Sequence, residues 1–265
     1  MSTGAPLLVE RRGRVRWLRL NRPDRRNALN PELISALDEQ ITAAETDPET
    51  AVVVVSGSGP SFCAGGDFRH FLKLREEGRN PVEFLTDVSR CFSRIEASPV
   101  PWVAVLHGHV VAGGLELALV CDVVVAADTT LIGDGHVNNR LTPAAGSSVR
   151  LADAVGRGLA RRLLLTGELL PARHFADTGW IHSIVPEADL DATATRICEV
   201  LVGRHGPAQR ELKALLHRIQ GLTREAALRA ELATFAQNWS TNSVADALTA
   251  FLDARLLKTT EAEAI

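Results

Sequence analysis

Cysteine is scarce in this chain, and its spacing suggests no pairing. The 265 residues include four cysteines, Cys63, Cys91, Cys121 and Cys198, and no C-x-x-C motif. Such spacing argues against a metal site built on cysteine and favours reduced thiols in a reducing compartment. The N-terminal residues MSTGAPLLVERRGR also lack an apolar core long enough for a signal peptide. We therefore expect a cytoplasmic protein.

Long apolar runs and a strong net charge are also absent. No uninterrupted apolar run approaches 18 residues, so we expect no membrane-spanning segment. The formal net charge is -3, which gives no general electrostatic case for a nucleic acid or an anionic membrane as partner. The one dense basic stretch is RRGRVRWLRLNRPDRR (11–26). It is either a solvated strand and turn or a contact for the phosphates of a ligand.

The common nucleotide-binding fingerprints are missing as well. The chain contains no G-x-x-x-x-G-K-[ST] phosphate loop, and its glycine-rich segments do not read G-x-G-x-x-G. The glycines that follow its apolar runs therefore need another explanation.

Strands and helices alternate over the first two thirds of the sequence. Apolar runs predict strands, and Asn30-Pro31 and Asn80-Pro81 are typical helix starts. This order predicts an α/β domain with largely parallel sheets over residues 1–204, followed by a helical region over 205–265. The apolar faces of those last helices exceed what one helical layer can bury. The expected strands are 15–21, 51–55, 102–108, 121–128 and 180–186, with strand and loop over 131–137, and the later helices begin near Asp189, Gly206, Thr223 and Ser243.

Two glycine turns follow buried strands. SGSGPSFCAGGD (56–67) comes after AVVVV, and HGHVVAGGLELAL (107–119) comes after WVAVL and leads into a helix that carries Glu116. Each turn is explained either by close packing or by backbone N–H groups that bind an oxygen. If amides from both turns meet at one carbonyl oxygen, they form an oxyanion hole.

The chain resembles the crotonase superfamily, which includes the enoyl-CoA hydratases and isomerases. The resemblance rests on LNRPDRRNALN (20–30), SFCAGGD (61–67), AGGLELALVCDVVVAAD (112–128) and LLLTGELLPARHFADTGWIHSIV (163–185), in this order. It implies a spiral of β-β-α turns with a C-terminal helical region that builds homotrimers or dimers of trimers. It also implies an acyl-CoA substrate, with coenzyme A as part of the substrate and no other cofactor or metal.

The resemblance assigns roles to individual residues. The N–H groups of Gly66 and Gly113 are expected to form the oxyanion hole for the thioester oxygen. The loop of Ala64, Gly65, Gly66 and Asp67 is expected to border the substrate. Glu116 takes the position of the first catalytic glutamate of the family. The turn with Arg22, Arg25, Arg26 and Ala28 is expected to hold the adenine and 3′-phosphate end of coenzyme A, since arginine suits phosphate.

One position departs from the family pattern. Where hydratases of the family carry a second glutamate in F-G-x-P-E, this chain reads LIGDGHVNNRLTPAAGSSVRL (131–151), and His136 stands at the glutamate position. A neutral imidazole accepts a proton as a carboxylate does, so His136 either transfers a proton, positions substrate or serves the structure. Asp134 is a weaker candidate, since it is expected to point away if His136 points in. Asn138 and Asn139 are expected to make this wall of the acyl pocket more polar than usual.

These residues favour a lyase that adds water to an α,β-unsaturated acyl-CoA through an enolate. Two alternatives stay open. One is isomerisation of an enoyl-CoA, or hydrolysis of an acyl-CoA or β-diketone, on the same fold. The other is a protein that binds acyl-CoA without catalysis.

Overall fold

The computed structural model describes residues 4–263, with side chains as far as Asp253, and divides into two compact units between Arg204 and His205. The strands, all in the first unit, are β1 (Leu7–Arg12), β2 (Val15–Leu20), β3 (Val52–Gly57), β4 (Trp102–Leu106), β5 (His109–Val111), β6 (Val123–Ala127), β7 (Leu131–Gly133), β8 (Leu170–Pro171) and β9 (Ser183–Val185). The α-helices of that unit are α1 (Pro31–Thr46), α2 (Phe68–Glu76), α3 (Val82–Ala97), α4 (Gly113–Leu119), α5 (Ser147–Val155), α6 (Arg157–Thr166) and α7 (Leu190–Val202).

The described strands form two sheets. The larger has the order β1-β2-β3-β4-β6-β9, and every pair in it is parallel except β1 with β2. The smaller has the order β5-β7-β8. The predicted parallel pairing is therefore confirmed. The sequence analysis missed β1, whose residues are mostly exposed and show no apolar alternation.

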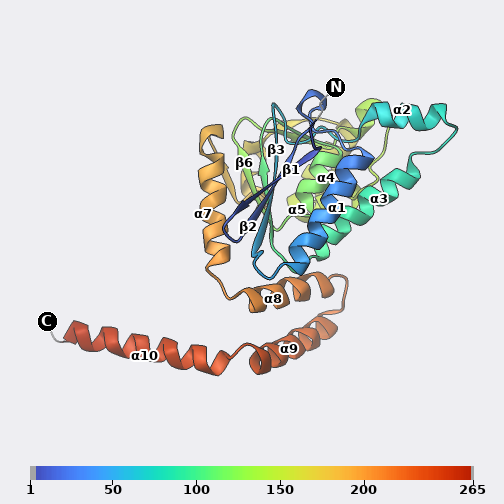
Figure 1. Cartoon of the computed structure of the whole chain (residues 1–265). Coiled ribbons are helices and arrows are strands. Elements are labelled where there is room, and N and C mark those ends of the chain that lie inside the picture. The colour runs from blue at the N-terminus through green and yellow to red at the C-terminus, as the bar shows by residue number, and fades with distance from the viewer. Residues whose placement is uncertain (1–3, 264–265) are drawn as a thin grey trace. The chain divides into compact units, whose positions relative to one another are not determined.

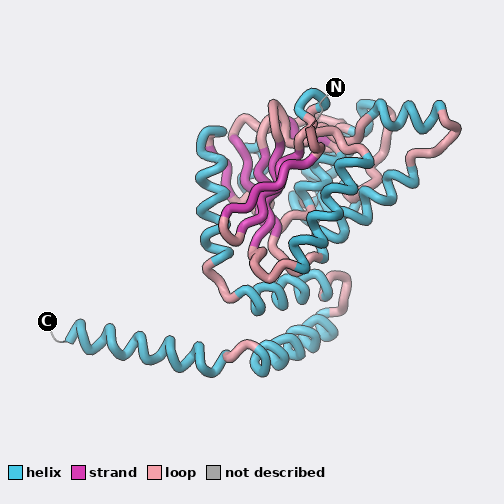
Figure 2. The backbone as a smooth tube through the Cα atoms, viewed as in Figure 1, coloured by secondary structure: helices cyan, strands magenta, loops and turns pink. Residues whose placement is uncertain are grey.

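Both faces of the larger sheet are buried, which explains the apolar runs. Along β3, Val53 and Val55 pack into the main core beneath α1 and α3, while Val52 and Val54 face the opposite side. That second side is covered by α7 through Leu190 and other residues. Figure 1 shows α7 on one side of the sheet and α1 and α3 on the other, and Figure 2 shows the strands between these helical layers. Burial on two faces is typical of parallel sheets.

The predicted helix start at Asn30 is confirmed. Its side chain accepts a hydrogen bond from the backbone N–H of Leu33 at 3.1 Å, and Pro31 occupies the first turn. The sequence analysis did not predict α2. Among its residues only Leu74 is buried. Phe68, Phe71 and Leu72 recur at helical spacing, and this signal could have found the helix.

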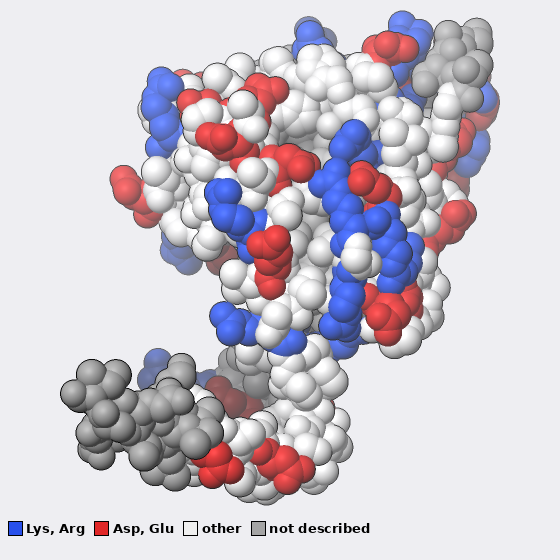
Figure 3. Space-filling view, turned by 60° about the vertical axis from the view of Figure 1, so that its left-hand side comes forward, with Lys and Arg blue, Asp and Glu red and all other residues white. Residues whose placement is uncertain are grey.

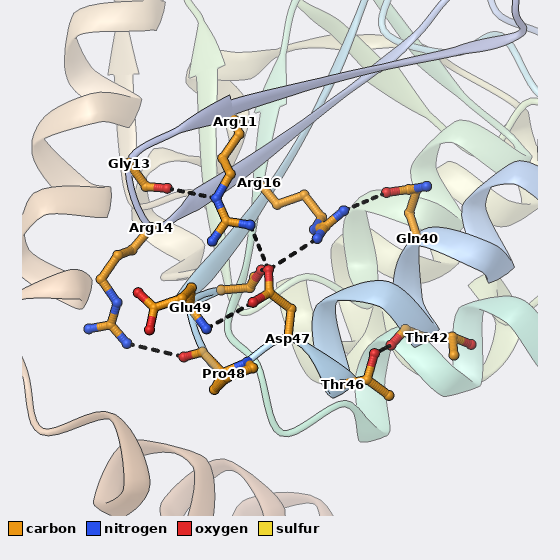
Figure 4. Close-up of polar contacts among 11 residues, drawn as sticks. Arg11, Gly13, Arg14, Arg16, Gln40, Thr42, Thr46, Asp47, Pro48 and Glu49 are labelled. Carbon is orange, nitrogen blue, oxygen red and sulfur yellow. Dashed lines mark hydrogen bonds and ion pairs between the residues drawn. The ribbon is translucent and has the colours of Figure 1, made fainter.

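Asp47 ties the β1–β2 hairpin to the end of α1 (Figure 4). Its carboxylate accepts from Arg11 at 2.6 Å and from Arg16 at 3.3 Å. The hydrogen bond from Arg11, followed by that from Thr50, holds the pKa of Asp47 well below its ordinary range. Part of the basic stretch is thus used in the fold. On the face shown in Figure 3, a band of Lys and Arg has Asp and Glu beside it.

The second unit is helical. It contains α8 (Gly206–Arg218), α9 (Arg224–Thr241) and α10 (Val244–Glu263). Arg218 of α8 donates to the hydroxyl of Thr234 on α9 at 2.6 Å. Large apolar side chains of α9 and α10 are exposed, as the sequence predicts: Leu228, Leu232, Phe235, Trp239, Leu248 and Leu252.

Among the residues that the structure describes, no helix is both long enough and apolar enough to cross a membrane.

Candidate active site

Hydrogen bonds join the two glycine turns predicted from the sequence. Cys63 donates its N–H to the carbonyl of His109 at 3.1 Å, and Val111 donates to the carbonyl of Cys63 at 3.0 Å. Gly114 allows this approach, because a Cβ there would lie 2.1 Å from the carbonyl oxygen of Cys63. Segments that lie some 50 residues apart in sequence therefore run side by side.

Gly66 and Gly113 line one cavity. Leu29 donates to the carbonyl of Gly65 at 2.8 Å and accepts from Asp67 at 2.9 Å, which directs the N–H of Gly66 away from Leu29. Gly113 is the first residue of α4, so its N–H lacks a partner within the helix. Both glycines line the same cavity, and neither N–H has an acceptor among the residues that the structure describes. The fold therefore brings the two glycines to one cavity, and their role as an oxyanion hole stays a prediction.

Backbone strain at Ala112 directs the second amide. Its φ of 51° and ψ of −118° lie outside the regions that a residue with a Cβ prefers. Such conformations cost about 1–3 kcal/mol and persist where surrounding structure enforces them. Here the carbonyl of Gly133 accepts from the N–H of Ala112 at 3.3 Å and holds the residue in place.

The cavity that these glycines line is small and mostly apolar. It has a volume of about 90 Å³. Among its lining residues, Glu116 and His136 are the two titratable side chains, and Asn139 and Thr142 add polar groups. The apolar wall comes from α2, α3 and neighbouring segments: Leu29, Phe68, Phe71, Phe84, Leu85, Val88, Val111 and Leu141.

Glu116 is held from one side. It lies on the first turn of α4 and is 2% exposed. Its Oε1 accepts from the backbone N–H of Ala145 at 2.9 Å and of Ser147 at 3.0 Å. Both bonds use the same oxygen, so the loop before α5 fixes the direction of the carboxylate and leaves Oε2 outside these bonds.

His136 is held by the aspartate that the sequence analysis discounted. Nδ1 of His136 lies 3.0 Å from Oδ1 of Asp134, which is fully buried. As expected, Asp134 is not among the residues that line the cavity. Gly135, with a φ of 64°, bends the chain so that the carboxylate of Asp134 contacts His136, which the sequence analysis did not foresee. Burial lowers the pKa of His136, but the hydrogen bond and charge of Asp134, aided by Glu116, outweigh it. The pKa of His136 therefore lies above its ordinary value.

The loop expected to border the substrate divides into two parts. Ala64 and Gly66 line the cavity, and Gly65 lies behind them with a φ of 104°, where a Cβ would be 2.9 Å from that of Ala112. Asp67 is not among the lining residues. It caps α2 by accepting from Arg69 at 3.0 Å and pairs with Arg22 at 2.7 Å.

The pair with Arg22 also sets the charge state of Asp67. Burial raises the pKa of Asp67, but the hydrogen bond and charge of Arg22 more than offset it, so the pKa lies below its ordinary value.

The arginine turn divides in a similar way. Arg22 is engaged with Asp67 and with the carbonyl of Ala28, so it braces the turn. Arg25 and Arg26 are exposed. Arg22 and Arg25 line an open cavity of about 370 Å³, separate from the apolar one. Arg26 and Ala28 are not among its lining residues.

Asn27, which the sequence analysis did not single out, organises this turn. It is fully buried and donates to the carbonyls of Ser58 and Ser61 at 2.9 and 2.7 Å. Its side chain also accepts from the N–H of Arg22 at 2.8 Å. The sequence around Asn27 does not show whether the asparagine supports the fold or binds a ligand.

Of the two asparagines expected in the pocket wall, one is there. Asn139 lines the cavity, whereas Asn138 donates to the carbonyl of Gly167 at 2.8 Å. The prediction that both make the wall polar is wrong for Asn138, since successive residues of the short 3-10 helix His136–Asn139 face different sides. The sequence analysis also missed Phe68, Phe71 and Phe84 as wall residues.

A metal site is not apparent. Across the residues that the structure describes, no group of three or more His, Cys, Asp and Glu side chains is placed to hold an ion.

Comparison with known proteins gives matches over nearly the whole chain. Residues 10–260 match the enoyl-CoA hydratase/isomerase family. A 2,3-dehydroadipyl-CoA hydratase of Escherichia coli is 32% identical over 94% of this chain and 96% of its own length. A short-chain-enoyl-CoA hydratase of Clostridium acetobutylicum is 30% identical over 95% of this chain and 96% of its own.

Solved structures give the same result. An enoyl-CoA hydratase from Polaromonas sp. JS666 superposes with a TM-score of 0.88 at 30% identity, over 94% of this chain and 97% of that one. An enoyl-CoA hydratase from Bacillus anthracis superposes with a TM-score of 0.88 at 26% identity, over 94% and 96% of the two chains.

Proposed function

The chain belongs to the enoyl-CoA hydratase/isomerase family, and from that premise we propose that it adds water to an α,β-unsaturated acyl-CoA through an enolate held in an oxyanion hole. The crotonase-like fold expected from the sequence is confirmed by the structural matches. One observation carries the proposal: Glu116 and His136 line the same small cavity as the amides of Gly66 and Gly113.

The two amides supply the electrostatic part of the reaction. As water attacks the β-carbon, the electron pair of the double bond moves toward the thioester, and negative charge develops on its oxygen. N–H groups of Gly66 and Gly113 that are already in place stabilise this charge without reorganisation. Loss of one such donor costs roughly 3–4 kcal/mol of transition-state stabilisation.

The two titratable side chains supply the proton transfers. Hydration needs a group that takes a proton from water and a group that gives one to the α-carbon. Glu116 and His136 are the two titratable side chains that line the cavity, so we assign both transfers to them.

The cavity favours a short acyl group. Its volume is about 90 Å³. Phe71 and Phe84, whose ring centroids lie 6.1 Å apart, contribute to its apolar wall. A short enoyl chain fits such a space, and Asn139 offers one polar contact to a functional group on it.

We propose that the arginine turn binds the coenzyme A end of the substrate, but that fewer of its residues do so than the sequence analysis expected. Arg22 is already paired, so we propose that Arg25 and Arg26, which are exposed, bind the phosphates, with Ala28 beside the adenine.

We further propose that the exposed apolar faces of α9 and α10 join copies of the chain into a trimer or a dimer of trimers. The four free cysteines support a cytoplasmic location.

A second activity is favoured by the Asp134–His136 pair. An imidazole oriented by a carboxylate beside an oxyanion hole is also suited to activate water for attack on the carbonyl carbon. Hydrolysis of the acyl-CoA or of a β-diketone is therefore the second candidate, ahead of double-bond isomerisation.

Incubation with crotonyl-CoA, and separately with a 3-enoyl-CoA, distinguishes these reactions. Hydration removes the absorbance of the conjugated thioester and adds the mass of one water, while coenzyme A stays attached. Release of a free thiol instead indicates hydrolysis. Gain of conjugation from a 3-enoyl-CoA indicates isomerisation. Binding without turnover across a panel of acyl-CoA thioesters contradicts an enzymatic function.

A further inference from the structure

The aspartate next to the active-site histidine makes its side-chain contacts with that histidine. Asp134 directly follows β7 and is fully buried. Its Oδ1 lies 3.0 Å from Nδ1 of His136, and its Oδ2 accepts from the backbone N–H of the same residue at 3.4 Å. The turn between them is compact, because a Cβ on Gly135 would lie 2.8 Å from a methyl group of Val111.

This geometry selects one tautomer of the imidazole. A carboxylate only accepts hydrogen bonds, so the proton of a neutral His136 lies on Nδ1 and the lone pair on Nε2. Because the ring lines the cavity while Nδ1 is bound to a fully buried group, Nε2 is the nitrogen that remains for a substrate or water.

We propose that Asp134 is a positioning residue: it orients His136 so that Nε2 can act as the base for the attacking water. Glu116 is then the group that protonates the α-carbon. This inference rests on the proposed function. In the hydration direction one O–H bond of water breaks, its oxygen bonds to the β-carbon, and its proton passes to Nε2 of His136. Glu116 in its acid form then gives a proton to the α-carbon of the enolate. Exchange with solvent after product release restores both groups.

The surroundings of the two groups support this division. Glu116 is bound by two N–H donors, whereas His136 is bound by an acceptor. When His136 gains a proton, Asp134 on its own loop stabilises the imidazolium, and Glu116 on α4 adds to this once it has given its proton to the enolate. The other residues that line the cavity carry no charge. The same two carboxylates raise the pKa of His136 against the effect of burial.

The test compares Asp134→Asn, His136→Gln and the double variant with wild type. An asparagine can present its N–H₂ group to Nδ1 and so favour the wrong tautomer. Such a change at a catalytic aspartate has lowered kcat by about 10⁴ in the serine-protease template. We expect Asp134→Asn to lower kcat on crotonyl-CoA by about 10²–10⁴ and to move the acidic limb of the kcat/KM profile to lower pH. In the His136→Gln background it should cost little more, because its effect passes through the histidine.

A matched control is Asp128→Asn, which removes an equal charge from an exposed position shortly before β7. It should leave kcat and the acidic limb unchanged. Asp134→Asn with wild-type kcat and an unmoved limb overturns the proposal. So does a loss that persists in full when His136 is already glutamine.

Nuclear magnetic resonance of the histidine ring nitrogens keeps the test independent of turnover and of the variant's folding. Wild-type His136 should titrate above the ordinary histidine range and be protonated at Nδ1 in its neutral form. A neutral form protonated at Nε2 overturns the positioning role. If the chain hydrates none of the enoyl-CoA thioesters tried but shows the Nδ1 tautomer, the proposed function fails while the positioning of His136 by Asp134 stands.

Discussion

Gly114 and Cys63 are in such close contact that a Cβ on the glycine would lie 2.1 Å from the cysteine carbonyl oxygen. This contact lets the segment after β3 run beside β5 and brings Gly66 and Gly113 to one cavity. The proposed oxyanion hole therefore depends on the absence of a Cβ at Gly114 as well as on the two amides.

The variant Gly114→Ala tests this dependence. Its methyl group would have to displace the backbone of Cys63, and overpacking of this kind typically costs about 1–3 kcal/mol. We expect a lower free energy of unfolding in urea and a loss of turnover larger than the loss of stability explains. Gly158→Ala is the control, because Gly158 lies in α6 and its Cβ would meet no atom within 4 Å. If both variants behave alike, the contact with Cys63 has no special importance.

Replacing Glu116 by glutamine tests the acid–base assignment. Glutamine keeps an oxygen that can accept from Ala145 and Ser147, so the loop should stay in place. Its amide cannot deliver a proton, and kcat on crotonyl-CoA should fall by about 10²–10⁴ while the substrate still binds. Stopped-flow kinetics and calorimetric binding of a substrate analogue measure the two parts. Unchanged turnover would remove Glu116 from the mechanism.

Phe84 lines both the acyl cavity and a larger, more polar groove. It lines the 90 Å³ cavity and also a groove of about 520 Å³ whose lining includes Asp38, His70 and Arg79. Phe84→Leu should open a passage between them and raise kcat/KM for an eight-carbon 2-enoyl-CoA relative to crotonyl-CoA by about tenfold, equivalent to roughly 1.4 kcal/mol. The ratio of the two kcat/KM values is the measurement. An unchanged ratio would show that chain length is limited elsewhere.

The Asp67–Arg22 pair predicts a pH dependence of stability. The pKa of Asp67 is lower in the folded protein than in the unfolded chain, so the pair contributes stability above the ordinary aspartate pKa and loses it as the pH falls through the lowered value. Asp67→Asn should therefore reduce the free energy of unfolding at pH 7 by about 1–3 kcal/mol. The difference from wild type should shrink as the pH is lowered toward 3. Thermal melts across this range check it, and a constant difference would contradict it.

Much of the fold follows from local patterns in the sequence. The buried strands β3 and β4 are continuous apolar runs because both faces of the sheet are covered, and Asn30 marks the start of α1 through its cap. Helix α2 escapes this reasoning. It buries only Leu74, and its apolar residues Phe68 and Phe71, which recur at helical spacing, line the acyl cavity instead of the core.

The sequence predicted the backbone of the candidate site better than its side chains. Glycines after buried strands indicate where amides are free, and Gly66 and Gly113 do line one cavity. The contact between Asp134 and His136 could not be read from spacing, because it depends on the positive φ of Gly135. The aromatic wall depends on how α2 and α3 pack, which no local motif encodes.

The most direct test of the central claim is a crystal structure with an unreactive acyl-CoA thioester bound. We predict the thioester oxygen at about 2.7–3.1 Å from both the Gly66 and the Gly113 nitrogen, with Glu116 and His136 on the α- and β-carbons. A thioester oxygen bound elsewhere, or to one of these amides alone, would contradict the account.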